Sequence, residues 1–295
     1  MRVIIDTDPG LDDAVAILYA LAESKLDVQA ITSVAGNIGL ERTTENAGRL
    51  LAAMGAELPV FMGAERPLSG PGRNEAAIHG ADGLGGVVLP APRSAPLPDA
   101  VGFMARMLQD APIGTLTILA LAPLSNLALL AREHPAAFAR LGGIIAMGGT
   151  VHELGNAGPF AEFNFASDPL AADIVLGASV PVTIIPLDVT RKIRVTRADL
   201  NALRHSGRPA ATTAAAFIDA YFVGSAHKSR PLHDPCVMLL ALNPDLFGIR
   251  EMRMRVDTYE HPGRLVPDAT RSPIRVAMRI DTDRARSTLW AGLSQ

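Results

Sequence analysis

The fold is decided near the N-terminus by the stretch Val3-Ile4-Ile5-Asp6-Thr7-Asp8-Pro9-Gly10-Leu11-Asp12-Asp13-Ala14-Val15-Ala16-Ile17. A run of β-branched residues from Val3 predicts a buried parallel strand, and Pro9-Gly10 ends that strand. Beyond the break, apolar residues recur at helical spacing as far as Leu21, which predicts a helix that begins near Asp12. A buried strand that leads directly into a helix is the unit from which parallel α/β sheets are built.

The same stretch carries four aspartates within eight residues, at positions 6, 8, 12 and 13. A first helical turn favours carboxylates through its unpaired N–H groups and its positive dipole end, so capping accounts for Asp12, Asp13 or both. Asp8 comes at the carboxyl end of the strand, where α/β sheets bind ligands, and it would repel Asp13 strongly unless a cation lay between them. Oxygen ligands alone favour Ca²⁺ or Mg²⁺ over zinc or copper. The alternative is a helix cap beside a solvated loop.

Composition limits the class of protein. The chain has 295 residues, of which 48% are hydrophobic, enough for a large core and, by length alone, for one or two domains. The net charge of −3 shows no basic excess, so nucleic acid is not an expected partner. Cys236 is the only cysteine, which excludes a disulfide framework and a thiolate zinc site. Because a strand begins by the third residue and no apolar run reaches membrane-spanning length, we expect a cytoplasmic protein without a signal peptide or a membrane partner.

Strand-like and helix-like stretches alternate along the rest of the chain, without an internal repeat or a linker. This alternation predicts an α/β fold in which residues 1–295 form a single domain, with a mostly parallel central sheet flanked by helices. Asp168 before Pro169 predicts a helix N-cap. The chain is also expected to contain a long Gly- and Pro-rich loop at residues 69–98, a helical and more charged region at residues 188–230, and a half-exposed edge strand at residues 275–280. Further strands are expected at residues 28–34, 59–62, 116–121, 143–147 and 182–187, and further helices at residues 41–54, 99–109, 123–131 and 235–242.

The acidic stretch is the first of four motifs, which are Asp6-Thr7-Asp8-Pro9-Gly10-Leu11-Asp12-Asp13-Ala14, Val34-Ala35-Gly36-Asn37, Ala161-Glu162-Phe163-Asn164 and His233-Asp234. In sequence and order these motifs resemble the inosine-uridine-preferring nucleoside hydrolase family, and the resemblance runs from residue 1 to the C-terminal strand. It implies a Rossmann-like α/β fold, a tightly held Ca²⁺ and hydrolysis of the N-glycosidic bond of ribonucleosides to ribose and free base. It also implies a homodimer or a homotetramer, because relatives commonly assemble in these ways.

The resemblance further assigns roles to individual residues. The implied metal ligands are Asp8, Asp13, Asp234 and the main-chain carbonyl of Leu121. Other members often carry Thr at the last position, but Leu should be tolerated because the carbonyl does the binding. The residues that match positions around the ribose are Asp12, Asn37, Asn156, Glu162, Asn164 and Asp234, and Met147 is included in the predicted substrate pocket.

The chemistry of Ca²⁺ agrees with these assignments. Ca²⁺ takes roughly six to eight oxygen ligands, which leaves room for protein, ribose hydroxyls and a water molecule together. Such a water would be acidified by the metal and would face Asp8, the expected general base. Positive charge that builds on the ribosyl ring as the C–N bond breaks is stabilised by carboxylate and amide oxygens. His233 is the expected donor of a proton or hydrogen bond to the departing base.

The base-binding part of the pocket is less constrained by sequence. His79 would be a surface residue if taken alone, but its Gly-rich segment matches a family position near the base and the ribose. Phe217, Tyr221 and Ser225 share one helical face, as a packed core stripe would. In the family this region often closes over the base, so Tyr221 and His227 are assigned to base contact.

Several of these residues also have structural explanations. His233 and Asp234 could simply begin a helix, and Asn37 could be a turn residue, although the motifs favour the site for all three. Glu162 and Asn164 lie in an aromatic-flanked loop, where buried polar groups without partners would be costly, and this favours ligand contact. Asp6, Cys236, Met238 and the remaining histidines are not assigned to the site: Asp6 is left to orient its neighbours, Cys236 and Met238 are expected in the core, and His134, His152, His205 and His261 are expected at the surface.

Two departures from the patterns of family members bear on the preference for the nucleobase. The segment after Phe217 differs from the more polar set that is typical of pyrimidine-preferring members, which argues against pyrimidine preference. Trp290 is the only tryptophan and stands near the C-terminus, so the tryptophans with which purine-specific relatives sandwich the base are missing. We therefore expect broad specificity or a preference for inosine and uridine.

Two other functions compete with this hypothesis. Asp6-Thr7-Asp8 superficially resembles the start of Mg²⁺-dependent aspartate-nucleophile phosphohydrolases, but these need Gly-Thr after the second Asp, and Pro9-Gly10 stands there. A phosphate-binding loop is excluded because no G-K-[ST] follows a glycine run. The second alternative is a non-catalytic, metal-dependent nucleoside or ribose binder, against which the complete set of acidic positions argues.

Overall fold

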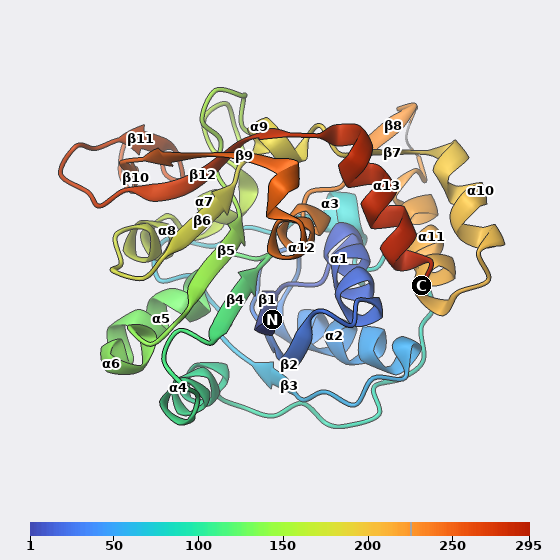
Figure 1. The fold of residues 1–295 in the computed structure, drawn as a ribbon, viewed down its shortest axis with the longest axis horizontal. Helices are drawn as coiled ribbons and strands as arrows, with labels where there is room; N and C mark the ends of the chain where they lie inside the picture. The colour runs from blue at the N-terminus through green and yellow to red at the C-terminus, as the bar shows by residue number, and fades with distance from the viewer. Residues whose placement is uncertain (225) are drawn as a thin grey trace.

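The central sheet is built around the first strand. The computed structural model describes residues 1–224 and 226–295, and within them eight strands form one sheet in the order β3-β2-β1-β4-β5-β6-β12-β9 (Figure 1). β1 (Arg2–Thr7) lies between β2 (Asp27–Ser33) and β4 (Leu116–Ala120) and is parallel to both. The strand order therefore reverses beside β1, and such a reversal leaves a crevice at the carboxyl ends of the strands.

The remaining strands extend the sheet on both sides. β3 (Val60–Met62) pairs with β2, while β5 (Gly143–Met147) and β6 (Val182–Ile185) follow β4, and all these pairs are parallel. This arrangement confirms the predicted α/β fold with a mostly parallel central sheet.

The prediction that residues 275–280 form an edge strand is wrong. β12 (Ile274–Ile280) is parallel to β6 on one side and antiparallel to β9 (Phe247–Met252) on the other, so β9 is the edge. Arg275 and Arg279 are exposed on β12, which produces the alternating pattern. Exposure of one face was taken for a free hydrogen-bonding edge, and β9 itself was not predicted.

Helices cover both faces of the sheet. The alternate side chains of β1, which point to opposite sides, are therefore buried from Val3 onward. Val3 and Ile5 belong to one core cluster, whereas Ile4 belongs to the other. The first cluster includes residues of α1 (Leu11–Ala22), α2 (Leu40–Met54), α10 (Arg197–His205), α11 (Pro209–Tyr221), α12 (Pro235–Leu242) and α13 (Thr282–Leu293), and the second includes residues of α4 (Ala100–Asp110), α5 (Ser125–Glu133), α6 (Pro135–Phe138) and α8 (Pro169–Leu176).

Short elements occur in the long loop and in the charged region. The loop at residues 69–98 contains α3 (Ala76–His79), and the charged region contains α9 (Leu187–Thr190) together with a ribbon of β7 (Arg194–Thr196) and β8 (Ser229–Pro231). The remaining elements are α7 (Phe163–Ser167), the 3₁₀ helix η1 (Pro244–Leu246), and a hairpin of β10 (Met254–Val256) and β11 (Leu265–Pro267).

Several single-residue predictions can be checked against this fold. Asp168 caps α8 as predicted, since its carboxylate accepts a hydrogen bond from Ala171 N at 3.1 Å. Cys236 and Met238 are fully buried in the core, as predicted. His152 and His205 are exposed, whereas His134 and His261 are half-buried. Among the described residues, no helix is both long enough and apolar enough to cross a membrane.

Candidate active site

A pocket opens at the carboxyl ends of β1, β4 and β5, where the strand order reverses. Leu121 and Met147 come from the ends of β4 and β5, and Asp12 and Asp13 come from the first turn of the helix that follows β1. The lining residues are Asp12, Asp13, Asn37, Glu75, Ile78, His79, Leu121, Met147, Asn156, Glu162, Phe163, Asn164, Tyr221, His233 and Asp234. The topology thus gathers residues from between positions 12 and 234 of the sequence into one cavity.

Three carboxylates crowd one part of this pocket. Asp12, Asp13 and Asp234 each offer an oxygen, and these oxygens lie within 4.8 Å of one another. We call these three residues the acidic cluster. Asp13 is fixed from several directions, because its carboxylate accepts hydrogen bonds from Thr7 Oγ1 at 2.7 Å, Gly10 N at 3.1 Å and Asn37 Nδ2 at 3.0 Å.

Asp8 lies behind the acidic cluster and is fully buried. Its Oδ2 accepts a hydrogen bond from Asn37 N at 2.6 Å, and its carboxylate lies within hydrogen-bond distance of Asp13. Within the described part of the chain, Asp8 Oδ1 has no hydrogen-bond partner. Gly36 makes this position possible, because a Cβ on Gly36 would collide with the Asp8 carboxylate.

Burial and like charges act together on these carboxyl groups. Desolvation raises the pKa of Asp8 well above its ordinary value, and the charge of Asp13 raises it further. Desolvation likewise raises the pKa of Asp234, with the charge of Asp12 as the next cause, and the same two causes raise the pKa of Asp13. A buried oxygen without a partner beside crowded carboxylates is the environment that a bound cation relieves. These residues therefore fit a divalent metal ion.

A loop segment forms another wall of the pocket. Asn164 Nδ2 donates to the main-chain carbonyl of Leu121 at 2.7 Å, and Asn156 Oδ1 accepts from Phe163 N at 2.8 Å. Glu162 caps α7 and accepts from the backbone N–H groups of Gly149, Asn164 and Phe165. Burial raises its pKa to about 7. Glu162 is therefore well supplied with protein partners, so its burial does not by itself require a ligand.

Two histidines are held at the pocket by hydrogen bonds. His79 Nδ1 accepts from Leu11 N at 3.0 Å, which satisfies a free N–H group in the first turn of α1. His233 N donates to Asp12 Oδ2 at 3.3 Å, and His233 Nδ1 lies 2.7 Å from Thr190 Oγ1. Desolvation lowers the pKa of His233, whereas the charge of Asp12 opposes that effect.

The comparison with known proteins decides the family. A sequence profile for inosine-uridine preferring nucleoside hydrolases matches residues 3–287. The chain belongs to this family. This nucleoside hydrolase is 37% identical over 294 residues to the pyrimidine-specific ribonucleoside hydrolase RihA of Photobacterium profundum, covering 96% of this chain and 94% of the relative. It is 40% identical over 267 residues to RihA of Citrobacter koseri, covering 88% and 84%.

Solved structures agree with the sequence relatives. A purine-preferring ribonucleoside hydrolase from Gardnerella vaginalis matches with a TM-score of 0.92 at 29% identity, covering 100% of this chain and 98% of that one. A plant nucleoside hydrolase matches with a TM-score of 0.93 at 30% identity, covering 99% and 98%. The protein is thus a ribonucleoside hydrolase, an enzyme that acts on N-glycosidic bonds, as the resemblance predicted.

Most of the predicted site residues of this nucleoside hydrolase line the pocket, but two of them do not. Asp8 lies behind the wall, as described above, and His227 is exposed and outside the lining set. Tyr221 does line the pocket, with the Arg230 guanidinium 4.2 Å from its ring centroid. Ser225, which was expected on the same helical face, lies outside the described residues. Asp6 is buried away from the lining set and accepts from Thr32 Oγ1 at 2.6 Å and from Asn126 Nδ2 at 2.8 Å.

Sequence reasoning missed three lining residues of the nucleoside hydrolase. Phe163 stands between the predicted Glu162 and Asn164, so the motif itself was a usable signal. Ile78 directly precedes His79, and Glu75 lies at the start of α3. Neither residue has a local pattern that indicates a site, because α3 is only four residues long and stands in the irregular loop.

Proposed function

We propose that the enzyme uses Ca²⁺ to hydrolyse ribonucleosides, inosine and uridine among them, to ribose and free base. The observation that carries this proposal is the acidic cluster backed by Asp8, whose Oδ1 has no partner among the described residues. The candidate ligand atoms of the acidic cluster are carboxylate oxygens, and Ca²⁺ is the cation that such ligand sets suit, with Mg²⁺ as its competitor.

The proposed ligands are the carboxylates of Asp8, Asp13 and Asp234 and the main-chain carbonyl of Leu121. Asp13 supports this assignment because it lies within hydrogen-bond distance of both other carboxylates, a contact that is unfavourable between two charged groups without a cation. Leu121 supports it because the residue lines the pocket and its carbonyl is held by Asn164. A bound Ca²⁺ would supply Lewis acidity toward a water molecule and toward the vicinal hydroxyls of a ribose.

Asp8 is the proposed general base. Its unpartnered Oδ1 takes one proton from the attacking water, whose oxygen forms the new bond to the anomeric carbon while the C–N bond breaks. The base leaves with the electron pair of that bond. Asp12 and Glu162 face the same pocket, where carboxylates stabilise the positive charge of the ribosyl ring.

His233 is the proposed donor to the departing base. It lines the pocket next to Asp12, and one of its ring nitrogens is held by Thr190, which leaves the other for the substrate. A hydrogen bond from the ring stabilises the negative charge that the departing nucleobase acquires, and solvent then protonates the nucleobase. Loss of the captured proton to solvent returns Asp8 to its starting state.

The ribose is assigned to a ring of polar residues, and the base to a more apolar set. Residues proposed to hold the ribose are Asp12, Asn37, Asn156, Glu162, Asn164 and Asp234; residues proposed at the base are His79, Met147, Tyr221 and His227. A second candidate preference is for pyrimidines alone, because the relatives at 37–40% identity are named pyrimidine-specific. The purine-preferring structural neighbour keeps the broader preference open.

A panel of substrates tests the function and its metal together. We expect release of free ribose, measured as reducing sugar, from inosine and uridine, with loss of activity after chelation and recovery when Ca²⁺ is added. Cytidine and adenosine define the breadth of specificity, and activity on uridine and cytidine alone would establish the pyrimidine-specific alternative. Binding of nucleoside without any release of ribose would instead support the non-catalytic binder.

Three broader predictions stay predictions at this point. They are a cytoplasmic location, a homodimer or homotetramer, and a single domain spanning residues 1–295. Sedimentation equilibrium would measure the assembly, and a single calorimetric unfolding transition with equal calorimetric and van't Hoff enthalpies would support the single domain.

A further inference from the structure

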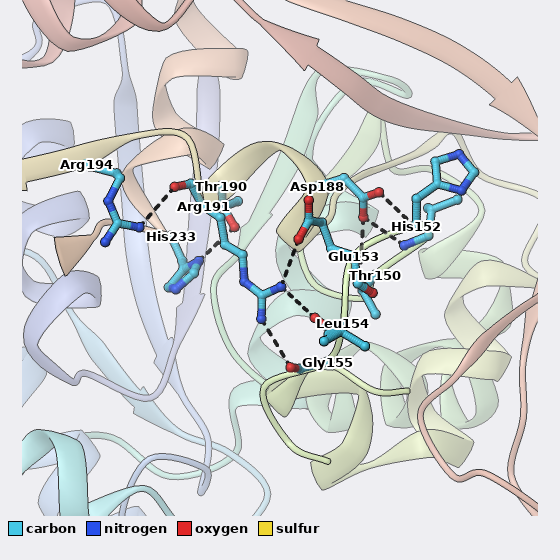
Figure 2. A network of polar contacts seen from close by, with 11 residues as sticks. Thr150, His152, Glu153, Leu154, Gly155, Asp188, Thr190, Arg191, Arg194 and His233 are labelled. Atoms are coloured by element: carbon cyan, nitrogen blue, oxygen red, sulfur yellow. Dashed lines mark hydrogen bonds and ion pairs between the residues drawn. The ribbon is translucent and has the colours of Figure 1, made fainter. Parts of the chain in front are cut away.

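The short helix α9 joins two parts of the pocket that are distant in sequence (Figure 2). On one side it contacts the loop at residues 150–155, which leads into Asn156: Asp188 accepts from Val151 N and His152 N, both at 2.8 Å. Arg191, just after the helix, donates to Leu154 O at 2.6 Å and to Gly155 O at 3.1 Å. On the other side, the Thr190 hydroxyl meets the ring of His233. The last residue of the helix is therefore held in place independently of the histidine that it contacts.

The contact between Thr190 and His233 is short and enclosed. Thr190 is fully buried, and its Oγ1 lies 2.7 Å from His233 Nδ1. In the described part of the chain, this hydroxyl has no second hydrogen-bond partner. His233 is also fixed through its backbone, since its N–H group donates to Asp12. The ring therefore has one nitrogen committed to Thr190 and one nitrogen available to the pocket.

The direction of this hydrogen bond follows from what each choice leaves unsatisfied. If His233 Nδ1 carried the hydrogen and donated it, the buried hydroxyl hydrogen of Thr190 would have no acceptor, which is costly. If Thr190 donates, that hydrogen is satisfied, and the neutral ring must carry its own hydrogen on Nε2. The second arrangement is favoured because it leaves no buried donor unpaired.

We propose that Thr190 is a positioning residue, whose hydroxyl donates to His233 Nδ1 and so holds the ring with an Nε2–H group directed at the substrate. This inference rests on the proposed role of His233 as donor to the departing base. Thr190 itself touches no reacting atom. Its contribution is to fix the tautomer and the orientation of the group that does.

Two variants isolate the hydroxyl. Thr190→Val keeps the branched shape and removes the donor, while Thr190→Ser keeps the donor and removes a methyl group. On uridine we expect Thr190→Val to lower kcat by a factor on the order of 10 and Thr190→Ser to restore most of it. On p-nitrophenyl riboside, whose leaving group departs as a stable anion, the same Val variant should change kcat by less than about twofold. Thr190→Ala is the second hydroxyl-free variant if valine impairs folding.

The ¹⁵N chemical shifts of His233 provide a readout that a purely structural role would not move. In the Ca²⁺-supplemented protein we expect the Nε2–H tautomer for the wild type and for Thr190→Ser, and a mixture of tautomers for Thr190→Val. Unchanged tautomer populations in Thr190→Val, or equal losses of kcat on both substrates, would overturn the inference.

His233→Ala separates this inference from the proposed function. If His233→Ala slows uridine far more than p-nitrophenyl riboside while Thr190→Val does not, the role of His233 stands and the role of Thr190 falls. If His233→Ala slows both substrates equally, the proposed leaving-group role fails and the inference fails with it. In the His233→Ala background, Thr190→Val should have no further effect on uridine.

Discussion

The acidic cluster and the contacts around α9 are both rich in charge, yet they balance that charge differently. In the acidic cluster, with Asp8 behind it, carboxylates face one another at hydrogen-bond distance, and Asp8 Oδ1 is unpartnered within the described residues. Around α9, the Asp188 carboxylate accepts from backbone N–H groups and Arg191 donates to backbone carbonyls and to Glu153. The second region is satisfied by the protein alone, whereas the first needs something that the chain does not supply.

This difference indicates that the first region takes part in binding or catalysis and that the second holds the structure in place. Unbalanced charge is costly to bury, so it persists where a ligand or a reaction uses it. Balanced charge can fix a segment in place without any ligand. Substitutions in the first region should therefore change the response to Ca²⁺ and substrate, whereas substitutions of the charged residues Asp188 and Arg191 in the second should act on stability alone.

The largest effect is expected at Asp8. Asp8→Asn removes the proposed general base and one proposed metal ligand together. Turnover of uridine should therefore fall by a factor on the order of 10² or more with the fold intact. Asp6→Asn is the matched control, because Asp6 is equally buried two residues earlier, with its pKa raised to about 6 by burial, but its carboxylate is bound by Thr32 and Asn126 and is not part of the proposed metal site. It should keep most of the activity. An unchanged kcat in Asp8→Asn would remove that residue from the mechanism.

The next effect is specific to the leaving group. His233→Ala should slow hydrolysis of natural nucleosides far more than hydrolysis of p-nitrophenyl riboside, because only the natural bases need a proton or hydrogen bond to depart. The ratio of kcat between the two substrates is the measurement. A variant that lost the same fraction of kcat on both would show that His233 acts on the ribose or on the fold.

A stability measurement tests the unbalanced charge directly. Asp234→Asn removes one charge that faces Asp13 and leaves a side chain that can donate to it. The metal-free variant should therefore have a higher Tm than the metal-free wild type at neutral pH, while the rise in Tm on adding Ca²⁺ should shrink. Retention of the full Ca²⁺-induced rise would exclude Asp234 as a ligand.

The pH dependence of the metal-free protein follows from the same groups. Raised pKa values for Asp8, Asp13 and Asp234 mean that folding favours the protonated carboxyl groups. Their contribution to stability is fully present below the ordinary carboxyl pKa of about 4 and is lost as the pH rises through the raised values. The Tm difference between Asp234→Asn and the chelated wild type should accordingly widen from acid to neutral pH.

The smallest effect is expected in the balanced region. Asp188→Asn keeps one acceptor oxygen but loses part of the bonding to Val151 and His152, which should cost about 1–2 kcal/mol of unfolding free energy. Urea unfolding with and without Ca²⁺ measures this cost, which should be the same in both conditions. A cost that appeared only with Ca²⁺ would show that α9 belongs to the metal site and would weaken the contrast between the two regions.

The same contrast explains how far the sequence could be interpreted. The first strand and helix, β5 and the cap at Asp168 follow local rules of periodicity and capping, so their positions could be predicted within a few residues. Asp12 and Asp13 could be placed near a pocket because they begin the helix that follows a strand whose carboxyl end faces the crevice of the sheet. Their meeting with Asp234 could not be derived locally and depended on the family motifs.

What the sequence did not indicate depends on tertiary contacts. β9 became the edge because it pairs antiparallel with β12, a choice that no periodicity in residues 247–252 reveals. Thr190 looks like any helical threonine until the fold brings His233 beside it, 43 positions away. His227 was assigned by its region and not by its own pattern, and it is exposed outside the pocket lining.

Gly36 shows how little room surrounds Asp8, the proposed general base. Even a single methyl group there would press on the Asp8 carboxylate from one side and on Pro123 from the other. Either the Asp8 side chain would then have to change position or the turn after β2 would have to move. Gly36→Ala should therefore abolish activity without changing any reacting group. The position of the proposed general base thus depends partly on the absence of a Cβ atom at Gly36.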